Sequence, residues 1–133
     1  MRVLIRGAGD IATGIALRLY RARMQVIMTD LPKPTAIRRT VCFSQAIVHG
    51  EAEVEGVRAI FAESIAAAER IADQGHIPVL ADPECACRAE LRPDALVDAI
   101  LAKRNLGTRI TDAPIVVGIG PGFTAGKDCH AVV

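Results

Sequence analysis

The stretch of sequence that decides the fold is Arg2-Val3-Leu4-Ile5-Arg6-Gly7-Ala8-Gly9-Asp10-Ile11-Ala12. Its first five residues are a short, β-branched and apolar run, which predicts a strand over residues 2–6. Gly7 and Gly9 break this run, and a stretch with apolar residues at helical spacing follows them. The segment therefore predicts a strand, a tight turn and a helix, in that order.

A second apolar run, over residues 25–29, ends at Asp30 and is followed by Pro32 and Pro34. Neither a strand nor a helix interior accommodates these two prolines well. The first quarter of the chain therefore predicts a βαβ unit with a right-handed crossover.

The turn of this unit matches the G-x-G-x-x-G/A fingerprint of dinucleotide-binding proteins in the required context. Gly7 permits the tight turn, Gly9 lets the backbone approach a pyrophosphate, and Ala12 lets helix and strand pack closely. Asp30, 21 residues after Gly9, stands where a carboxylate accepts hydrogen bonds from a ribose hydroxyl. Asp10 opposes this interpretation, because its charge would lie near the pyrophosphate, although it suits a helix cap. A turn that only packs the helix on the sheet is the alternative.

The remaining elements alternate between strands and helices along the chain. We predict a helix or an extended segment over residues 35–46, an exposed strand or small hairpin over 53–60, a helix over 63–74, a strand over 77–82, a strand (or a helix) over 95–101, a strand over 115–119 and the start of a strand over 128–133. This order predicts an α/β fold, a Rossmann-like open and mainly parallel sheet with helices on both faces. Residues 1–133 form a single domain in this interpretation, and the interrupted last strand suggests a missing C-terminal continuation.

Composition narrows the function classes. A chain of 133 residues with 51% hydrophobic residues is normally one folded domain and is not disordered. The chain has only four aromatic residues and a net charge of +1, which argues against nucleic acid as a partner. No run approaches the roughly 18 apolar residues of a membrane span, and no signal peptide is evident. We therefore expect a cytoplasmic protein without a membrane partner.

Charge is segregated along the chain. Residues 1–50 carry eight Lys or Arg and two Asp, whereas residues 51–98 carry eleven acidic residues and four Arg. Residues 99–133 carry four basic residues and two Asp. This pattern indicates either a cleft that attracts anions or segments that neutralise each other when they pack, and the second is more common.

Two later loops are candidate anion sites. The glycine-rich loop over residues 118–128 fails the P-loop pattern, because Pro121 stands where Gly is needed and Asp128 where Ser or Thr is needed. It still offers backbone N–H groups, and a long structural turn is the alternative. The second candidate is the cationic loop over residues 103–109, which suits phosphate or carboxylate but is equally a solvated loop. The candidate residues of the two loops are Gly120, Gly122, Thr124, Lys127, Lys103, Arg104 and Asn105.

The cysteines predict no metal site. Cys85-Ala86-Cys87 is too short for the usual zinc spacing and has no second Cys/His pair. Two ordinary cysteines are favoured over a pair that exchanges disulfides or takes up sulfur. The residues identify no catalytic group, and only His130, beside Cys129, is a weak candidate.

Four stretches together resemble one family: residues 5–14, 37–44, 102–108 and 120–128, which include Gly7, Thr13, Asn105 and Lys127. The chain is similar to the accessory proteins of selenium-dependent molybdenum hydroxylases, which are related to the XdhC/CoxI maturation proteins of xanthine and carbon monoxide dehydrogenases. The resemblance implies a Rossmann-like domain, a role in maturation of the molybdenum cofactor and a molybdenum hydroxylase subunit as partner. It gives Cys85, Cys87 and Cys129 no role.

These observations lead to one hypothesis and two alternatives. The hypothesis is an accessory protein whose glycine-rich and cationic loops hold a phosphate-bearing cofactor, either NAD(P) or a molybdopterin-type cofactor. The alternatives are an NAD(P)-dependent oxidoreductase and a non-catalytic protein-interaction module; a homo-oligomer is compatible with each. The candidate cofactor-binding residues are Gly7, Gly9, Asp10, Ala12, Thr13, Asp30, Lys103, Arg104, Asn105, Gly120, Gly122, Thr124 and Lys127.

Overall fold

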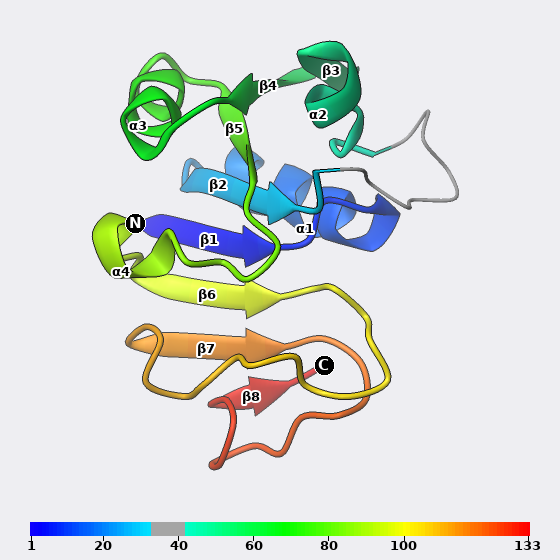
Figure 1. Cartoon of the computed structure of the whole chain (residues 1–133), viewed down its shortest axis with the longest axis vertical. Coiled ribbons are helices and arrows are strands. Elements are labelled where there is room, and N and C mark those ends of the chain that lie inside the picture. Colours follow the sequence, from blue (N-terminus) through cyan, green and yellow to red (C-terminus); the bar gives the residue numbers. More distant parts are fainter. Residues whose placement is uncertain (33–41) are drawn as a thin grey trace.

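A computed structural model describes residues 1–32 and 42–133 of the chain (Figure 1). Its elements are β1 (Arg2–Arg6), α1 (Asp10–Arg21), β2 (Gln25–Asp30), α2 (Gln45–His49), β3 (Glu51–Val54), β4 (Val57–Ala62), α3 (Ile65–Asp73), β5 (Ile77–Ala81), α4 (Arg88–Leu91), β6 (Ala95–Asp98), β7 (Ile115–Gly118) and β8 (Ala131–Val132). The predicted strand, turn and helix over the first 21 residues are confirmed.

The strands form one eight-stranded sheet with the order β3-β4-β5-β2-β1-β6-β7-β8. All neighbours pair in parallel except β3 and β4, which form the antiparallel hairpin that the sequence around Gly56 predicts. Without this hairpin, the order β5-β2-β1-β6-β7-β8 is that of the doubly wound dinucleotide-binding sheet, 3-2-1-4-5-6. The strands β1, β2, β6 and β7 point the same way in Figure 1. The predicted open, mainly parallel Rossmann-like sheet is therefore confirmed.

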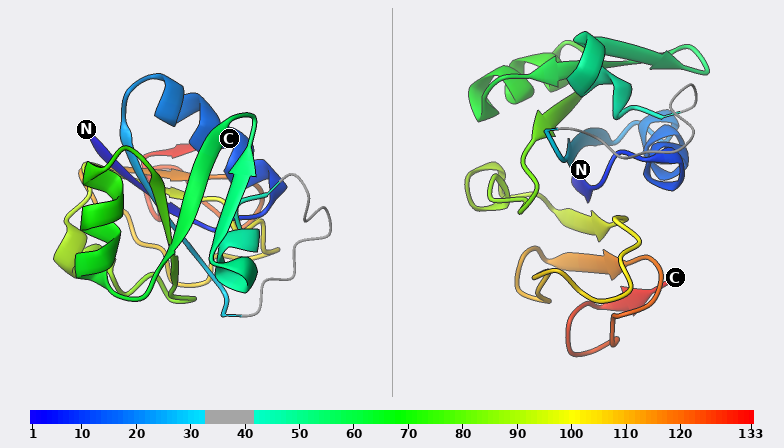
Figure 2. Two further views of the ribbon diagram at one scale, coloured as in Figure 1. Left: turned by 90° about the horizontal axis from the view of Figure 1, so that it is seen from above. Right: turned by 45° about the vertical axis from the view of Figure 1, so that its right-hand side comes forward.

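Helices cover both faces of the sheet, also as predicted. Ala12 and Ala16 of α1 pack with Ala46 of α2 on one face, together with Phe43. Ala68 of α3 and Leu91 of α4 pack on the opposite face. Figure 2 shows α1 and α3 on opposite sides of the strands.

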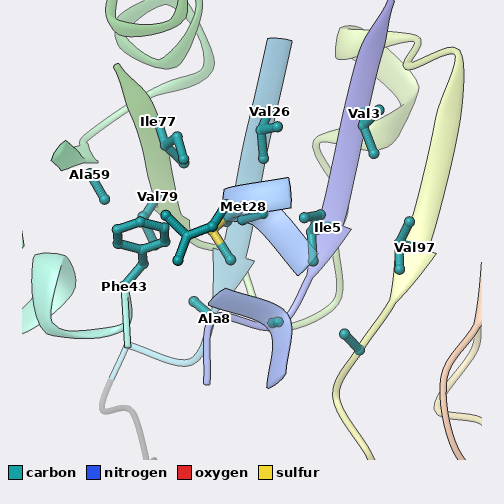
Figure 3. Close-up of a cluster of buried hydrophobic side chains, with 14 of the residues drawn as sticks. Val3, Ile5, Ala8, Val26, Met28, Phe43, Ala59, Ile77, Val79 and Val97 are labelled. Atoms are coloured by element: carbon teal, nitrogen blue, oxygen red, sulfur yellow. The ribbon is translucent and has the colours of Figure 1, made fainter. Parts of the chain in front are cut away.

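The core under α1 is built from small and branched side chains, and its one large ring is the fully buried Phe43. Figure 3 shows this ring beside Val79 and shows Ala8, from the glycine turn, below Ile5 and Met28. The turn is therefore anchored to the core by its middle residue.

Several predicted boundaries were wrong. The predicted helix over 35–46 lies largely outside the described residues, and the described Cys42–Ser44 are not helical, so α2 begins only at Gln45. The strand predicted over 95–101 ends at Asp98. There the Asp98 carboxylate accepts a hydrogen bond from the Ile100 N–H (3.2 Å), and Leu101 has a left-handed φ of 64°. Both features turn the chain away from the sheet.

The alternation of strands and helices also stops earlier than predicted. Residues 99–133 contain no helix, so β6, β7 and β8 are joined by loops. The start of a strand predicted over 128–133 is confirmed as the short β8. Among the described residues, no helix has the length and apolar character needed to cross a membrane.

Candidate functional site

The site lies where the order of the sheet reverses. From β1 the chain proceeds to β2 on one side, and it later returns to β6 on the other side of β1. Ligands of open α/β sheets bind in the crevice at this point, beyond the carboxyl ends of the strands. A cavity of about 320 Å³ opens here, and it is lined by Arg6, Gly7, Ala8, Gly9, Asp10, Ile11, Ala12, Thr29, Asp30, Leu31, Pro83, Ala99, Ile100, Leu101 and Leu106.

Gly7 shapes the cavity by close packing. Its φ is 113°, which side-chain-bearing residues rarely adopt. A Cβ on Gly7 would lie 2.9 Å from the carbonyl oxygen of Ala99, the first residue after β6. The Gly7 N–H also donates to the Thr29 carbonyl oxygen (2.7 Å) at the end of β2. Gly7 therefore lets the ends of three neighbouring strands meet.

Gly9 differs, because a Cβ on it would meet no atom within 4 Å. It is the N-cap of α1 and has φ −72°, so its backbone does not require glycine. The missing side chain instead leaves open space beside the first turn of a helix, whose N–H groups have no intrahelical partner. This fits the predicted approach of a phosphate group. The cap prediction for Asp10 was wrong, since Asp10 is already the first residue of the helix.

Asp30 stands at the end of β2 and lines the same cavity. Its Oδ2 accepts from the Ala8 N–H (3.2 Å) and its Oδ1 from the Leu31 N–H (2.8 Å), so it braces the glycine turn. Burial raises the pKa of this carboxyl above its ordinary value, and the two backbone hydrogen bonds oppose that rise. Its position at the end of β2 is the one that its spacing predicts, and its role toward a ligand stays a prediction.

Below the turn lies a buried polar cluster that the sequence interpretation missed. Arg6 and Asp98 are register partners on β1 and β6, with 3.8 Å between Nη1 and Oδ2. Thr108 joins them, since its hydroxyl donates to Asp98 (2.6 Å) and accepts from Arg6 (3.2 Å). A second nitrogen of the Arg6 guanidinium, Nη2, donates to the Pro83 carbonyl oxygen (3.1 Å). A charged residue closing the apolar run over residues 2–6 was the available signal.

The rim of the cavity is apolar and exposed. The lining includes four exposed apolar residues, of which between 40% and 47% is accessible: Leu101 and Leu106 from the loop after β6, Ile11 of α1 and Leu31 of the loop after β2. Ile11 is exposed although it is apolar and lies in the first turn of α1. Such a rim suits a ligand with a flat apolar ring or a partner that covers the opening.

The structure brings five of the predicted residues to the cavity: Gly7, Gly9, Asp10, Ala12 and Asp30. Thr13 is not among the lining residues. It is buried, its hydroxyl accepts from the Phe43 N–H (2.9 Å) and donates to the Ala8 carbonyl oxygen (3.4 Å). Its role is therefore to join α1 to the segment before α2.

Of the cationic loop, Leu106 lines the cavity but the predicted binding residues do not, and no residue of the second glycine-rich loop lines it. A Cβ on Gly122 would lie 2.6 Å from the Arg104 Cα, so the two loops touch backbone to backbone. Gly120 similarly approaches Leu101, a lining residue. The other candidate residues of these loops, which do not line the cavity, are Lys103, Asn105, Thr124 and Lys127.

Hydrogen bonds within the two loops account for part of their conformation. Asn105 Oδ1 accepts from the N–H groups of Gly107 (3.0 Å) and Thr108 (2.8 Å), and the Thr124 N–H donates to Asp128 (3.0 Å). Packing explains Gly118, because a Cβ there would overlap the Phe123 ring. These contacts favour the structural-turn alternative for the second loop. Residues 1–32 and 42–133 contain no cluster of three or more His, Cys, Asp or Glu that could hold a metal ion.

Comparison with known proteins gives one informative match. The chain is 59% identical over 131 residues to the uncharacterized protein YqeB of Escherichia coli K12. The match covers 98% of this chain and 24% of YqeB, so the chain spans about a quarter of the length of this relative. No family model matches the chain. No solved structure matches it.

Proposed function

We propose that this domain binds a phosphate-bearing nucleotide-type cofactor in the cavity at the carboxyl ends of β1, β2 and β6. The observation that carries the proposal is the open space at Gly9, which lies beside the first turn of α1 at the switch point of the sheet. The dipole of a 12-residue helix and the N–H groups of its first turn favour an anion at this position, where the anion would compete with the Asp10 carboxylate for the Ile11 N–H (3.0 Å). The residues present therefore fit such a group.

Charge in the cavity narrows the class of ligand. Its ionisable lining residues are Arg6, Asp10 and Asp30, and Arg6 is paired with Asp98. Two carboxylates next to the phosphate position favour a ligand of low charge, and Asp30 would repel a phosphate on the ribose 2′ position. We therefore expect NAD(H) to bind better than NADP(H).

The cellular role rests on the family resemblance. We propose an accessory protein for the maturation of a selenium-dependent molybdenum hydroxylase, with a molybdopterin-type cofactor as the other candidate ligand. A pterin ring would suit the apolar rim formed by Leu101, Leu106, Ile11 and Leu31 as well as a nicotinamide or adenine ring would. A hydroxylase subunit is the proposed partner, and the cytoplasm is the proposed location.

A panel of ligands tests this function. Purified protein is titrated with NAD(H), NADP(H), molybdopterin and its nucleotide form, and heat is measured. We expect saturable binding of NAD(H) or of a molybdopterin form. Absence of binding across the panel would remove the site assignment, whereas preference for NADP(H) would contradict the role of Asp30. Co-purification with a hydroxylase subunit tests the maturation role separately.

A second candidate function, an NAD-dependent oxidoreductase, is favoured by the position of Asp30 at the end of β2. Proton transfer would have to use Asp10 or Asp30, because the other ionisable group of the lining, Arg6, stays protonated. Consistent hydride transfer from NADH to small carbonyl compounds would establish this function.

The exposed rim of the cavity favours the other alternative, a non-catalytic interaction module. This function predicts tight association with a partner protein in the absence of bound nucleotide.

A further inference from the structure

The loop after β5 carries two cysteines, Cys85 and Cys87, and the backbone of Cys85 has an unusual conformation. Asp82 holds this loop, since its carboxylate accepts from the N–H groups of Ala86 (3.0 Å) and Cys87 (2.8 Å). The Asp82 carbonyl oxygen accepts from the Cys85 N–H (3.0 Å). Cys85 has a left-handed φ of 55°, a conformation that costs free energy in a side-chain-bearing residue. The surrounding structure therefore imposes the position of Cys85.

Both cysteines face the core rather than the solvent. Cys85 is 1% exposed and Cys87 is 4% exposed, and both belong to the apolar cluster that includes Leu4 and Ile27. All four cysteines of the chain are buried thiols. The pair is thus enclosed, and only a small reagent can reach it without a large opening of the loop.

The neighbours of Cys85 favour its anionic form. Its pKa is lowered, first by the neighbouring Cys87 side chain, and further by the nearby Thr29 hydroxyl and by the charge of Arg6. Burial and the Asp82 carboxylate act in the opposite direction. The pKa of Cys87 is raised, chiefly by the neighbouring Cys85 side chain and by burial.

Two polar side chains on the same side of the sheet as Cys85 have hydrogen-bond donors without a partner in the described part of the chain. Arg6 and Thr29 are register partners on β1 and β2. Two residues before them, Leu4 and Ile27 lie in the Cys85 cluster, so Arg6 and Thr29 face the same side of the sheet. Arg6 Nε and Thr29 Oγ1 are buried atoms without a hydrogen-bond partner in the described part of the chain. Buried donors of this kind normally have an acceptor, and an anionic sulfur is one.

We propose that Cys85 and Cys87 form a redox-active dithiol that reacts with a small hydroperoxide, with Cys85 as nucleophile and Cys87 as resolving thiol. The Cys85 thiolate attacks one oxygen of hydrogen peroxide, the O–O bond breaks, and the hydroxide released takes up the proton that Cys85 had lost. The product is a sulfenic acid and one water.

The second step closes the disulfide. The Cys87 sulfur attacks the Cys85 sulfur, the S–O bond breaks, and the departing hydroxide leaves with the Cys87 proton as a second water. In total the two thiols lose two electrons and two protons, and the peroxide is reduced to two waters. Burial selects the oxidant, because a hydroperoxide is far smaller than a disulfide such as oxidised glutathione. This proposal does not depend on the cofactor.

The test maps oxidation in the folded chain. Protein is treated with hydrogen peroxide, remaining thiols are alkylated after denaturation, and tryptic peptides are analysed by mass spectrometry. We expect a disulfide within the peptide that holds both Cys85 and Cys87, reversible by dithiothreitol. Cys85→Ser is expected to leave Cys87 reduced. Cys87→Ser is expected to leave a Cys85 sulfenic acid that dimedone labels.

Two further variants separate a reactive site from ordinary buried thiols. Thr29→Val removes the hydroxyl but keeps the shape, and we expect the oxidation of Cys85 to slow by about tenfold, the effect of one hydrogen bond to a charged group. Cys129→Ala removes a thiol from the same cluster and is expected to leave the rate unchanged. Oxidation of Cys85 no faster than that of Cys129, or a disulfide that includes Cys129, would overturn the proposal.

Discussion

At the scale of single residues, the structure explains the two glycines of the turn in different ways. Gly7 has a positive φ and no room for a Cβ, whereas Gly9 has an ordinary φ and open space. We expect Gly7→Ala to lower the free energy of unfolding by about 1–3 kcal/mol. Gly9→Ala is expected to cost less than about 1 kcal/mol, the usual range for an N-cap change. Urea denaturation of both variants measures this, and equal losses would contradict the assignment.

Asp30 makes stability depend on pH. Its pKa is raised in the native state above the ordinary value of 3.8, so the folded protein binds this proton more tightly than the unfolded chain does. The stability that this proton contributes is fully present below the unfolded pKa, and it is lost as the pH rises through the native pKa.

Asp30→Asn removes this titration. We expect the unfolding free energy of the wild type, minus that of the variant, to fall as the pH rises from the ordinary pKa through the raised one, and then to stay level. Urea denaturation at a series of pH values gives this difference. A difference that rises with pH in that window would mean that the native pKa is lowered instead.

At the scale of elements, α1 contains a glycine without a packing reason. Gly14 lies inside the helix and is exposed, and a Cβ on it would meet no atom within 4 Å. Glycine in an exposed helix interior costs about 0.5–1 kcal/mol relative to alanine. Gly14→Ala should therefore raise the unfolding free energy by about that amount, as measured by urea denaturation. Destabilisation would show that this face of α1 is in contact with something else.

The boundary of β6 shows where local sequence reasoning fails. Residues 95–101 are mostly apolar, so periodicity alone extends the strand to Leu101. The strand ends at Asp98 because the carboxylate there is held by Arg6 of β1 and Thr108 of a later loop. These partners are 92 and 10 residues away in sequence, so the pattern of residues 95–101 alone does not show what fixes the Asp98 carboxylate.

At the scale of the whole molecule, some of the segregated charges pair across segments. Arg2 pairs with Glu69 (3.6 Å) and Arg21 with Glu55 (3.2 Å), while Arg6 pairs with Asp98. These ion pairs join the basic first segment to the acidic middle segment. The two exposed pairs contribute little to stability. Packing between the two segments therefore accounts for part of the charge pattern.

The sequence predicts the βαβ unit, the sheet class and the core of the candidate site, because the fingerprint and its strand–turn–helix context are local. Gly7, Gly9 and Asp30 meet at the cavity for that reason. The positions of Lys103 and Lys127 could not be predicted in the same way. Their loops replace the helices that a doubly wound fold normally has, and the contact of Gly122 with Arg104 is set by packing between them.

The most direct test of the central claim is calorimetric titration of NAD⁺ into the wild type and into Gly9→Val, with Gly14→Ala as the matched glycine control. A Val side chain would fill the open space beside the first turn of α1. We predict saturable binding to the wild type and to Gly14→Ala, and at least a tenfold loss in Gly9→Val, which corresponds to about 1.4 kcal/mol. Equal affinity of a folded Gly9→Val variant would contradict the account.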